Sequence, residues 1–214
     1  MKEDENVLKT GTTTVGVVCK DGIVLGADRR ATAGNFIAHK KTDKIYSLND
    51  SIAVTIAGTA SDAQLLVKLT QSELKLKDLR THRRTSTKEA ANLIARMVYS
   101  NIRKLSMIPG ISHFIIGGVD DSGFHLYDCF PDGSLEEIKD YVSSGSGSVM
   151  AYGVLDTLYE QSMTVHDGVN LVVKCVNAAL QRDSASGDGL DVVAITKDGV
   201  KKVIAKELKT RIEI

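Results

Sequence analysis

The order in which two kinds of apolar periodicity follow one another constrains the fold of this chain more than any single motif. Short alternating or continuous apolar segments, typical of strands, come first, and two longer segments with helical spacing follow them. The same succession recurs before a last pair of strands. Because each sheet and helix must bury an apolar face, this order predicts an α+β fold of paired sheets covered by helices on both outer faces.

Turn residues separate the expected strands. Asp21 and Gly22 give a hairpin signal near the amino terminus, and similar polar turns recur between later segments. The strands are expected at residues 13–19, 23–27, 45–48, 52–57, 112–118, 124–128, 137–142, 192–196 and 200–204. The first strands therefore form a β meander.

Four helices are expected, at residues 61–79, 90–105, 149–159 and 167–180. The first two are predicted to be amphipathic and to pack as a helical hairpin on one sheet face. Pro109 and Gly110 are expected to stop the second helix. Thr164 and Asp167 resemble a capping box at the start of the fourth.

Length and charge narrow the classes of function. The chain has 214 residues and 43% hydrophobic residues, which favours one substantial core. Lys plus Arg and Asp plus Glu both number 27, so no net charge attracts nucleic acid or anionic lipid. No stretch is long and apolar enough to span a bilayer, and residues 1–11 lack the apolar run of a signal peptide. We therefore expect no nucleic-acid partner and no membrane association.

The cysteines do not indicate a metal site. Cys19, Cys129 and Cys175 are widely spaced in apolar surroundings, as expected for core thiols in a reducing compartment. No Cys or His pair has metal-ligand spacing, so no bound metal is expected. The five histidines lie outside recognisable nucleophile motifs, which disfavours a serine-histidine-acid triad without excluding it.

Gly11 and Thr12 can be interpreted as a cut site followed by a nucleophile. If the bond between them is broken, Thr12 gains a free α-amino group beside its hydroxyl, and an amino terminus titrates near ~8. Thr12 would then carry its own general base. Taken alone, the threonine run is more typical of the start of a strand.

Three further residues could serve such a nucleophile. Asp28 ends the second expected strand and Lys44 precedes the third, so a buried pair of the two could place a fixed charge beside Thr12. Gly58 joins a strand to a helix, where its amide could bind an oxyanion. The alternatives are two solvated surface charges and a simple turn.

Two polar segments precede or follow expected helices. Ser146 lies in the Ser/Gly run 143–148, which could be a flexible loop, a helix cap or a phosphate cradle, although it lacks the Gly-Lys ending of a P-loop. Asp183 and Ser186 follow the last long helix. They could form a plain helix end, or they could orient the amine of Thr12.

Together these segments resemble the catalytic β subunits of archaeal 20S proteasomes. The matching strings are Gly-Thr-Thr-Thr-Val-Gly at 11–16, Asp-Arg-Arg-Ala-Thr at 28–32, Lys44, Ile-Ala-Gly at 56–58, Gly-Ser-Gly-Ser at 145–148, Tyr-Gly-Val-Leu at 152–155 and Arg-Asp-Ser-Ala-Ser-Gly at 182–187. The resemblance implies the four-layer αββα sandwich of amino-terminal-nucleophile hydrolases. It also implies a propeptide at 1–11 and a single catalytic domain at 12–214.

The resemblance also implies a role for each candidate residue in a threonine-type endopeptidase without a cofactor. Thr12 would be the nucleophile after autocatalytic cleavage of the Gly11–Thr12 bond. The other implied roles are an activating charge pair (Asp28, Lys44), a hydrogen-bond network around the amine (Ser146, Asp183, Ser186), an oxyanion donor (Gly58) and substrate-binding positions (Ala31, Thr32, Ile56, Ala60). The small apolar side chains among these positions lead us to expect cleavage after hydrophobic residues.

The implied partners are those of the family: proteasome α subunits, other β subunits in stacked heptameric rings, an AAA ATPase regulator and unfolded protein substrates in the cytoplasm. The main alternative is a structural β-type subunit that never matures. Such a subunit would be expected to lack Gly11, Thr12, Lys44 or Asp183, and all four are present. The six-fold bacterial relative and a metabolic amidase of the same superfamily are further alternatives.

Overall fold

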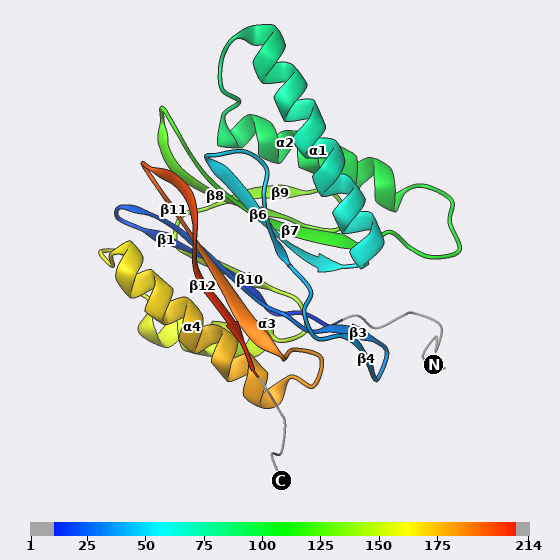
Figure 1. Ribbon diagram of the computed structural model, residues 1–214, viewed down its shortest axis with the longest axis vertical. Coiled ribbons are helices and arrows are strands. Elements are labelled where there is room, and N and C mark those ends of the chain that lie inside the picture. Colours follow the sequence, from blue (N-terminus) through cyan, green and yellow to red (C-terminus); the bar gives the residue numbers. More distant parts are fainter. Residues whose placement is uncertain (1–10, 209–214) are drawn as a thin grey trace.

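The computed structural model describes residues 11–208, which form two stacked sheets between two pairs of helices (Figure 1). Each of the two sheets has five antiparallel strands. The α+β class and the four-layer αββα sandwich are confirmed.

The first sheet collects strands from three distant parts of the chain. Its order is β10-β1-β2-β11-β12. The bounds are β1 Thr14–Cys19, β2 Gly22–Asp28, β10 Tyr141–Ser144, β11 Gly189–Thr196 and β12 Gly199–Glu207. Pairing of β2 with β11 brings residues near 28 beside residues near 190.

The second sheet is a meander in the order β5-β6-β7-β8-β9. Its strands are β5 Ile45–Ser47, β6 Ile52–Gly58, β7 Ser112–Asp120, β8 Gly123–Cys129 and β9 Leu135–Ile138. A separate hairpin of β3 Ala31–Ala33 and β4 Phe36–His39 was not expected from the sequence. It projects from the end of the sandwich where β2 finishes (Figure 1).

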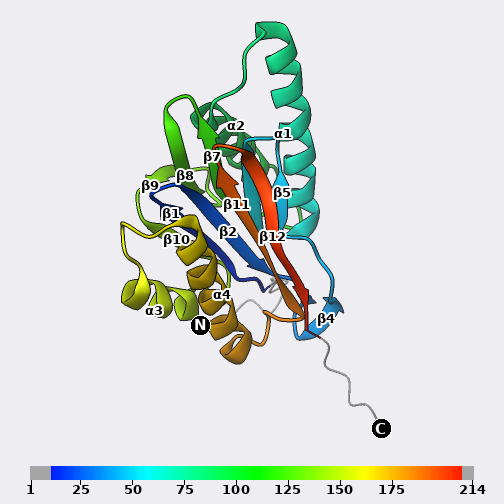
Figure 2. The same cartoon turned by 60° about the vertical axis from the view of Figure 1, so that its left-hand side comes forward.

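Two helical hairpins cover the outer faces. Helices α1 Ala60–Thr81 and α2 Thr87–Ile102 pack on the second sheet, and α3 Ser148–Leu158 and α4 Val165–Arg182 pack on the first (Figure 2). A third apolar cluster, which includes Ile23, Ile115 and Leu126, fills the space between the sheets. The sheet that contains Thr14 is therefore buried on both faces.

Side-chain caps fix where two helices begin. Thr164 and Asp167 form the expected capping box at the start of α4. Ser86 and Glu89 form a second capping box at the start of α2, which places this helix three residues earlier than expected. No helix within residues 11–208 is long and apolar enough to cross a membrane.

Two sequence expectations about element boundaries were wrong. The strand expected at 137–142 is two strands, because the chain leaves the second sheet after Ile138 and enters the first at Tyr141. The second helix ends at Ile102, well before Pro109, and Leu105 lies fully exposed beyond it. Beyond this end the Asn101 side-chain amide donates to the Gly110 carbonyl oxygen at 3.2 Å, which joins the returning chain to the last turn of the helix.

Helix α1 is not cleanly amphipathic. It buries Leu66 and Leu74 against the second sheet, as expected. Four other leucines, Leu65, Leu69, Leu76 and Leu79, are exposed to solvent. The apolar residues of α1 therefore face both the core and the outside.

Candidate active site

The candidate residues gather at one end of the two sheets. Thr12 lies just before β1, where the neighbouring strand β2 ends at Asp28. Gly58 ends β6, Ser146 follows β10 and Asp183 caps the carboxyl end of α4. Five separate parts of the chain thus deliver polar groups to one place, because the elements that carry them end at the same edge.

Asp28 is the fully buried anchor of the site. Its Oδ1 accepts from Lys44 Nζ at 2.7 Å and from the Thr13 backbone N–H at 2.9 Å. Its Oδ2 accepts from the backbone N–H groups of Gly187 at 3.0 Å and Arg30 at 3.1 Å. A buried carboxylate needs such partners, and here both oxygens have two each.

Lys44 is 4% exposed and reaches from Asp28 toward Thr12. Its Nζ lies 3.5 Å from the Gly11 carbonyl oxygen. Burial lowers the pKa of Lys44 below its ordinary value, and the opposing attraction of Asp28 only partly offsets this effect. The ammonium is therefore more acidic than a surface lysine, which suits a group that shares protons with a nucleophile.

The Thr12 hydroxyl lies against the bond that precedes it. Thr12 Oγ1 donates to the Gly11 carbonyl oxygen at 2.6 Å, and the Thr12 backbone N–H donates to Ser146 Oγ at 3.2 Å. A Cβ on Gly11 would overlap Ala185. A glycine before Thr12 therefore lets the chain pass through a gap that a larger residue would not fit.

Asp183 accepts hydrogen bonds from two serine hydroxyls near Thr12. Ser146 Oγ and Ser186 Oγ each donate to Asp183 Oδ2 at 2.6 Å. The Thr13 hydroxyl lies 2.7 Å from Ser186 Oγ. A continuous hydrogen-bond network therefore runs from the Thr12 nitrogen through Ser146, Asp183 and Ser186 to Thr13.

A small cavity of about 50 Å³ opens beside Thr12 and Lys44. Its lining includes Gly58 and all four residues expected to bind substrate: Ala31, Thr32, Ile56 and Ala60. Gly58 has a φ of 100°, and a Cβ there would overlap the Ile111 carbonyl oxygen. Every candidate residue predicted from the sequence thus lies either in the hydrogen-bond network or on the cavity wall.

Comparison with known proteins identifies the family. A family model described as "Proteasome subunit" matches residues 8–195. The chain belongs to the proteasome subunit family. This assignment confirms the resemblance drawn from the sequence.

Similar curated proteins carry the name "Proteasome subunit beta" and come from archaea. One from Archaeoglobus profundus is 44% identical over 207 residues, which cover 96% of this chain and 94% of that protein. One from Methanothermobacter thermautotrophicus is 41% identical over 98% of each chain. One from Methanosarcina barkeri is 43% identical over 97% of this chain and 96% of that protein. The archaeal β-type assignment is therefore confirmed as well.

Sequence reasoning missed four residues of this proteasome-family site. Thr42, Ala57 and Ala63 line the cavity, and Thr13 joins the hydrogen-bond network. The three cavity residues follow no motif that marks them. Thr13 carried a signal, because it is adjacent to Thr12, but a strand start explains such a residue equally well.

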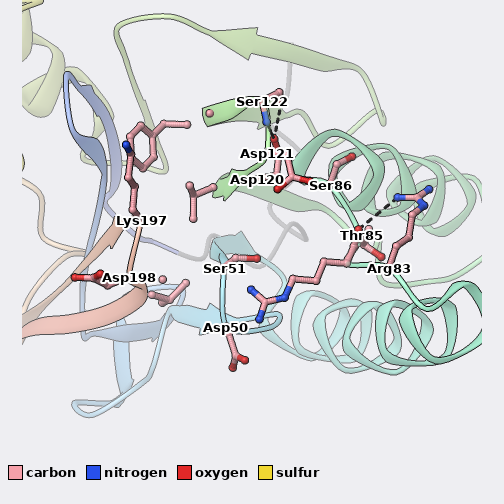
Figure 3. Close-up of a pocket in the computed structure, with 16 residues that line it drawn as sticks. Asp50, Ser51, Arg83, Thr85, Ser86, Asp120, Asp121, Ser122, Lys197 and Asp198 are labelled. Carbon is pink, nitrogen blue, oxygen red and sulfur yellow. Dashed lines mark hydrogen bonds between the residues drawn. The ribbon is translucent and has the colours of Figure 1, made fainter.

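A second, wider cleft of about 1170 Å³ lies at the opposite end of the strands. Figure 3 shows side chains of both charges around it, among them Asp50, Arg83, Asp120 and Lys197. These residues come from strand turns and from the loop between α1 and α2. Arg83 is already paired with Glu89, so the cleft offers no concentrated charge of one sign.

The three cysteines contribute nothing to the site. Cys19, Cys129 and Cys175 are buried free thiols, and burial raises the pKa of each to about 12. They are protonated core residues under ordinary conditions. Within residues 11–208 no group of three His, Cys, Asp or Glu residues could hold a metal ion.

Proposed function

We propose that this chain is a catalytic β subunit of a 20S proteasome core and acts as a threonine endopeptidase. One observation carries the proposal. The Thr12 hydroxyl and Lys44 Nζ both approach the Gly11 carbonyl oxygen of the Gly11–Thr12 peptide bond. Asp28 holds Lys44, and Asp183 holds Ser146, which accepts from the nitrogen of that bond. A structural subunit has no need for a buried Asp28–Lys44 pair at this position.

The proposed reaction begins once Thr12 is the first residue. Thr12 Oγ attacks the carbonyl carbon of a substrate peptide, and its proton passes to the free Thr12 amine. The amine then gives the proton to the leaving nitrogen as the peptide C–N bond breaks, which leaves an ester on Thr12. Water attacks that ester, releases the carboxyl product and restores the Thr12 hydroxyl.

Two groups would support the charges that develop in this reaction. The buried Lys44 ammonium, held by Asp28, approaches the same Gly11 carbonyl oxygen as the Thr12 hydroxyl and would favour the alkoxide that attacks. The Gly58 amide is the proposed donor to the oxyanion, supported by the place of Gly58 on the wall of the same cavity. Ser146 would hold the amine in line with the hydroxyl.

Removal of residues 1–11 would use the same nucleophile. Residues 1–10 lie outside the described residues, so the proposal rests on Gly11 and Thr12. The Thr12 hydroxyl is within hydrogen-bond distance of the Gly11 carbonyl, and Lys44 Nζ approaches the same oxygen. These contacts support attack of Thr12 Oγ on the Gly11 carbonyl carbon, transfer of the acyl group to oxygen and hydrolysis of the resulting ester.

Gly11 also suggests how substrate binds. Its backbone N–H donates to Thr32 Oγ1 at 2.9 Å, so Gly11 lies where a residue of an extended peptide would add beside β3. The cavity next to it is lined mainly by Ala31, Ile56, Ala60 and other small apolar groups. We therefore propose cleavage after hydrophobic residues, and preferential cleavage after acidic or basic residues would contradict this preference.

The proposed partners follow from the family. The chain would assemble with α subunits and other β subunits into stacked heptameric rings, receive unfolded proteins from an AAA ATPase and work in the cytoplasm. The names of its archaeal relatives support the β position in such a particle. The four exposed leucines of α1 support burial of that helix against another subunit.

Intact mass measured after co-assembly with an α-type subunit tests the proposal. Loss of residues 1–11 together with peptide hydrolysis is the expected result for the wild-type chain. A Thr12→Ala variant should assemble, keep its leader and hydrolyse no peptide, because it lacks the hydroxyl. A wild-type chain that keeps its leader and is inactive would favour the structural subunit, and leader loss in Thr12→Ala would refute self-processing.

A further inference from the structure

Thr13 connects the two halves of the candidate site. Its backbone N–H donates to Asp28 Oδ1, which also holds Lys44, and its hydroxyl lies 2.7 Å from Ser186 Oγ. The residue is fully buried, so its side chain does not touch a substrate. Any influence of Thr13 on a reaction must therefore pass through its neighbours.

Counting hydroxyl protons fixes the direction of each hydrogen bond. Ser186 has one hydroxyl proton and donates it to Asp183 Oδ2 at 2.6 Å. Ser186 Oγ can therefore only accept from Thr13, which makes Thr13 the donor. Ser146 likewise donates its hydroxyl proton to Asp183 Oδ2, so Ser146 Oγ acts as the acceptor for the Thr12 backbone N–H.

From these donor and acceptor directions we infer that Thr13 is a positioning residue for the Thr12 amine, an inference that rests on the proposed function. The Thr13 hydroxyl keeps the proton of Ser186 on Asp183, because a donor at Ser186 Oγ prevents that hydroxyl from turning away. With the Ser186 proton held on Asp183 Oδ2, the same oxygen can accept the Ser146 proton in one fixed direction. Ser146 stays an acceptor, which holds an N–H of the amine and leaves the nitrogen lone pair to face Thr12 Oγ.

The neighbouring backbone makes room for this arrangement. A Cβ on Gly147 would overlap Thr13 Oγ1 and would lie 3.2 Å from Asp183 Oδ2. Gly147 therefore leaves space for the hydroxyl beside the carboxylate. The Thr13 side chain also has a matched neighbour, because Thr14 is equally buried and its hydroxyl binds Ser144 Oγ at 2.9 Å, outside the Asp183 network.

Steady-state hydrolysis of a peptide with a hydrophobic residue before the cleaved bond tests the inference. The wild-type chain, Thr13→Val, Thr13→Ser and Thr14→Val are each co-assembled with an α-type subunit, and rates are divided by the leader-free fraction from intact mass. Thr13→Val should lower kcat about tenfold with KM within about twofold, because it removes one buried donor from a coupled network. Thr13→Ser and Thr14→Val should stay near wild type.

Each other outcome has a defined meaning. Unchanged kcat in Thr13→Val overturns the inference, as does an equal loss in Thr14→Val, which would mean general damage to the strand. Failure of Thr13→Ser to restore kcat also overturns it, because the serine keeps the donor. A wild-type particle without hydrolysis refutes the proposed function itself, whereas an active wild type with an unaffected Thr13→Val refutes only the positioning role.

Discussion

Removing the Lys44 ammonium should destabilise the folded chain, because it leaves the buried Asp28 carboxylate without its cationic partner. At 2.7 Å and an effective dielectric constant of about 20, the attraction between the two charges is ~6 kcal/mol. Burial outweighs this attraction at Lys44, whose pKa is lowered, so the ammonium adds little stability of its own. The cost in Lys44→Met arises from the carboxylate left behind, for which losing a buried partner costs about 3–5 kcal/mol.

The three backbone N–H groups that remain on Asp28 favour the lower end of that range, ~3 kcal/mol. With a urea slope of about 2 kcal/mol/M, the unfolding midpoint should fall by ~1.5 M. The assay is urea unfolding followed by circular dichroism. All chains carry Thr12→Ala, so that they share one covalent structure.

Lys139→Met is the matched control. Lys139 lies 2.5 Å from Glu137, closer than Lys44 lies to Asp28, but its side chain is 74% exposed. An exposed pair contributes about 0–1 kcal/mol, so this midpoint should move by less than ~0.5 M. Equal shifts in the two variants would refute the argument that burial, and not distance, sets the cost.

Two further predictions concern the backbone and the thiols. Gly58→Ala should lower the free energy of unfolding by about 1–3 kcal/mol more than Gly34→Ala. Both glycines have positive φ, but of the two only Gly58 would bring a Cβ into overlap with the backbone. Equal urea midpoints for the two variants would contradict this prediction. The three cysteines, with pKa values near 12, should resist iodoacetamide at about pH 8 in the native chain and react fully in denaturant, as counted by mass. Burial raises the pKa of these thiols from the ordinary value of 9.0, so the stability that they contribute is complete below about pH 9 and declines above it. Cys175→Ala should therefore lose less stability than the wild-type chain between about pH 8 and 10. Rapid labelling of the native chain would show that the thiols are not buried.

The sequence predicted the layers well because periodicity reports which faces are buried. The sequence-based prediction failed where one continuous apolar pattern covers residues that lie in two different surroundings in the structure. Residues 137–142 look like one strand, yet the chain changes sheets between Ile138 and Tyr141, and both halves keep strand geometry. In α1, apolar spacing alone did not tell the buried Leu66 from the exposed Leu65.

The candidate site was predicted through its motifs, and each motif alone had a plain structural explanation. The sequence could not show that these residues meet in space, because they lie far apart along the chain. Ser146 and Asp183 are 37 positions apart, and Thr12 and Ser146 are 134 positions apart. Thr13 escaped notice for the same reason. Its partner Ser186 lies 173 positions away, and only the pairing of β1, β2 and β11 brings the two together.

The order in which the strands of the first sheet are synthesised sets a time at which the proposed nucleophile can be assembled. During synthesis the chain emerges from its amino terminus, so Thr12 and Asp28 appear early, whereas Asp183, Ser186 and the neighbouring strand β11 appear near the end. Contacts of such long sequence separation also form slowly. A nascent chain that has not reached Ser186 lacks part of the network around Thr12, so the proposed nucleophile cannot be assembled until synthesis of the chain is nearly complete.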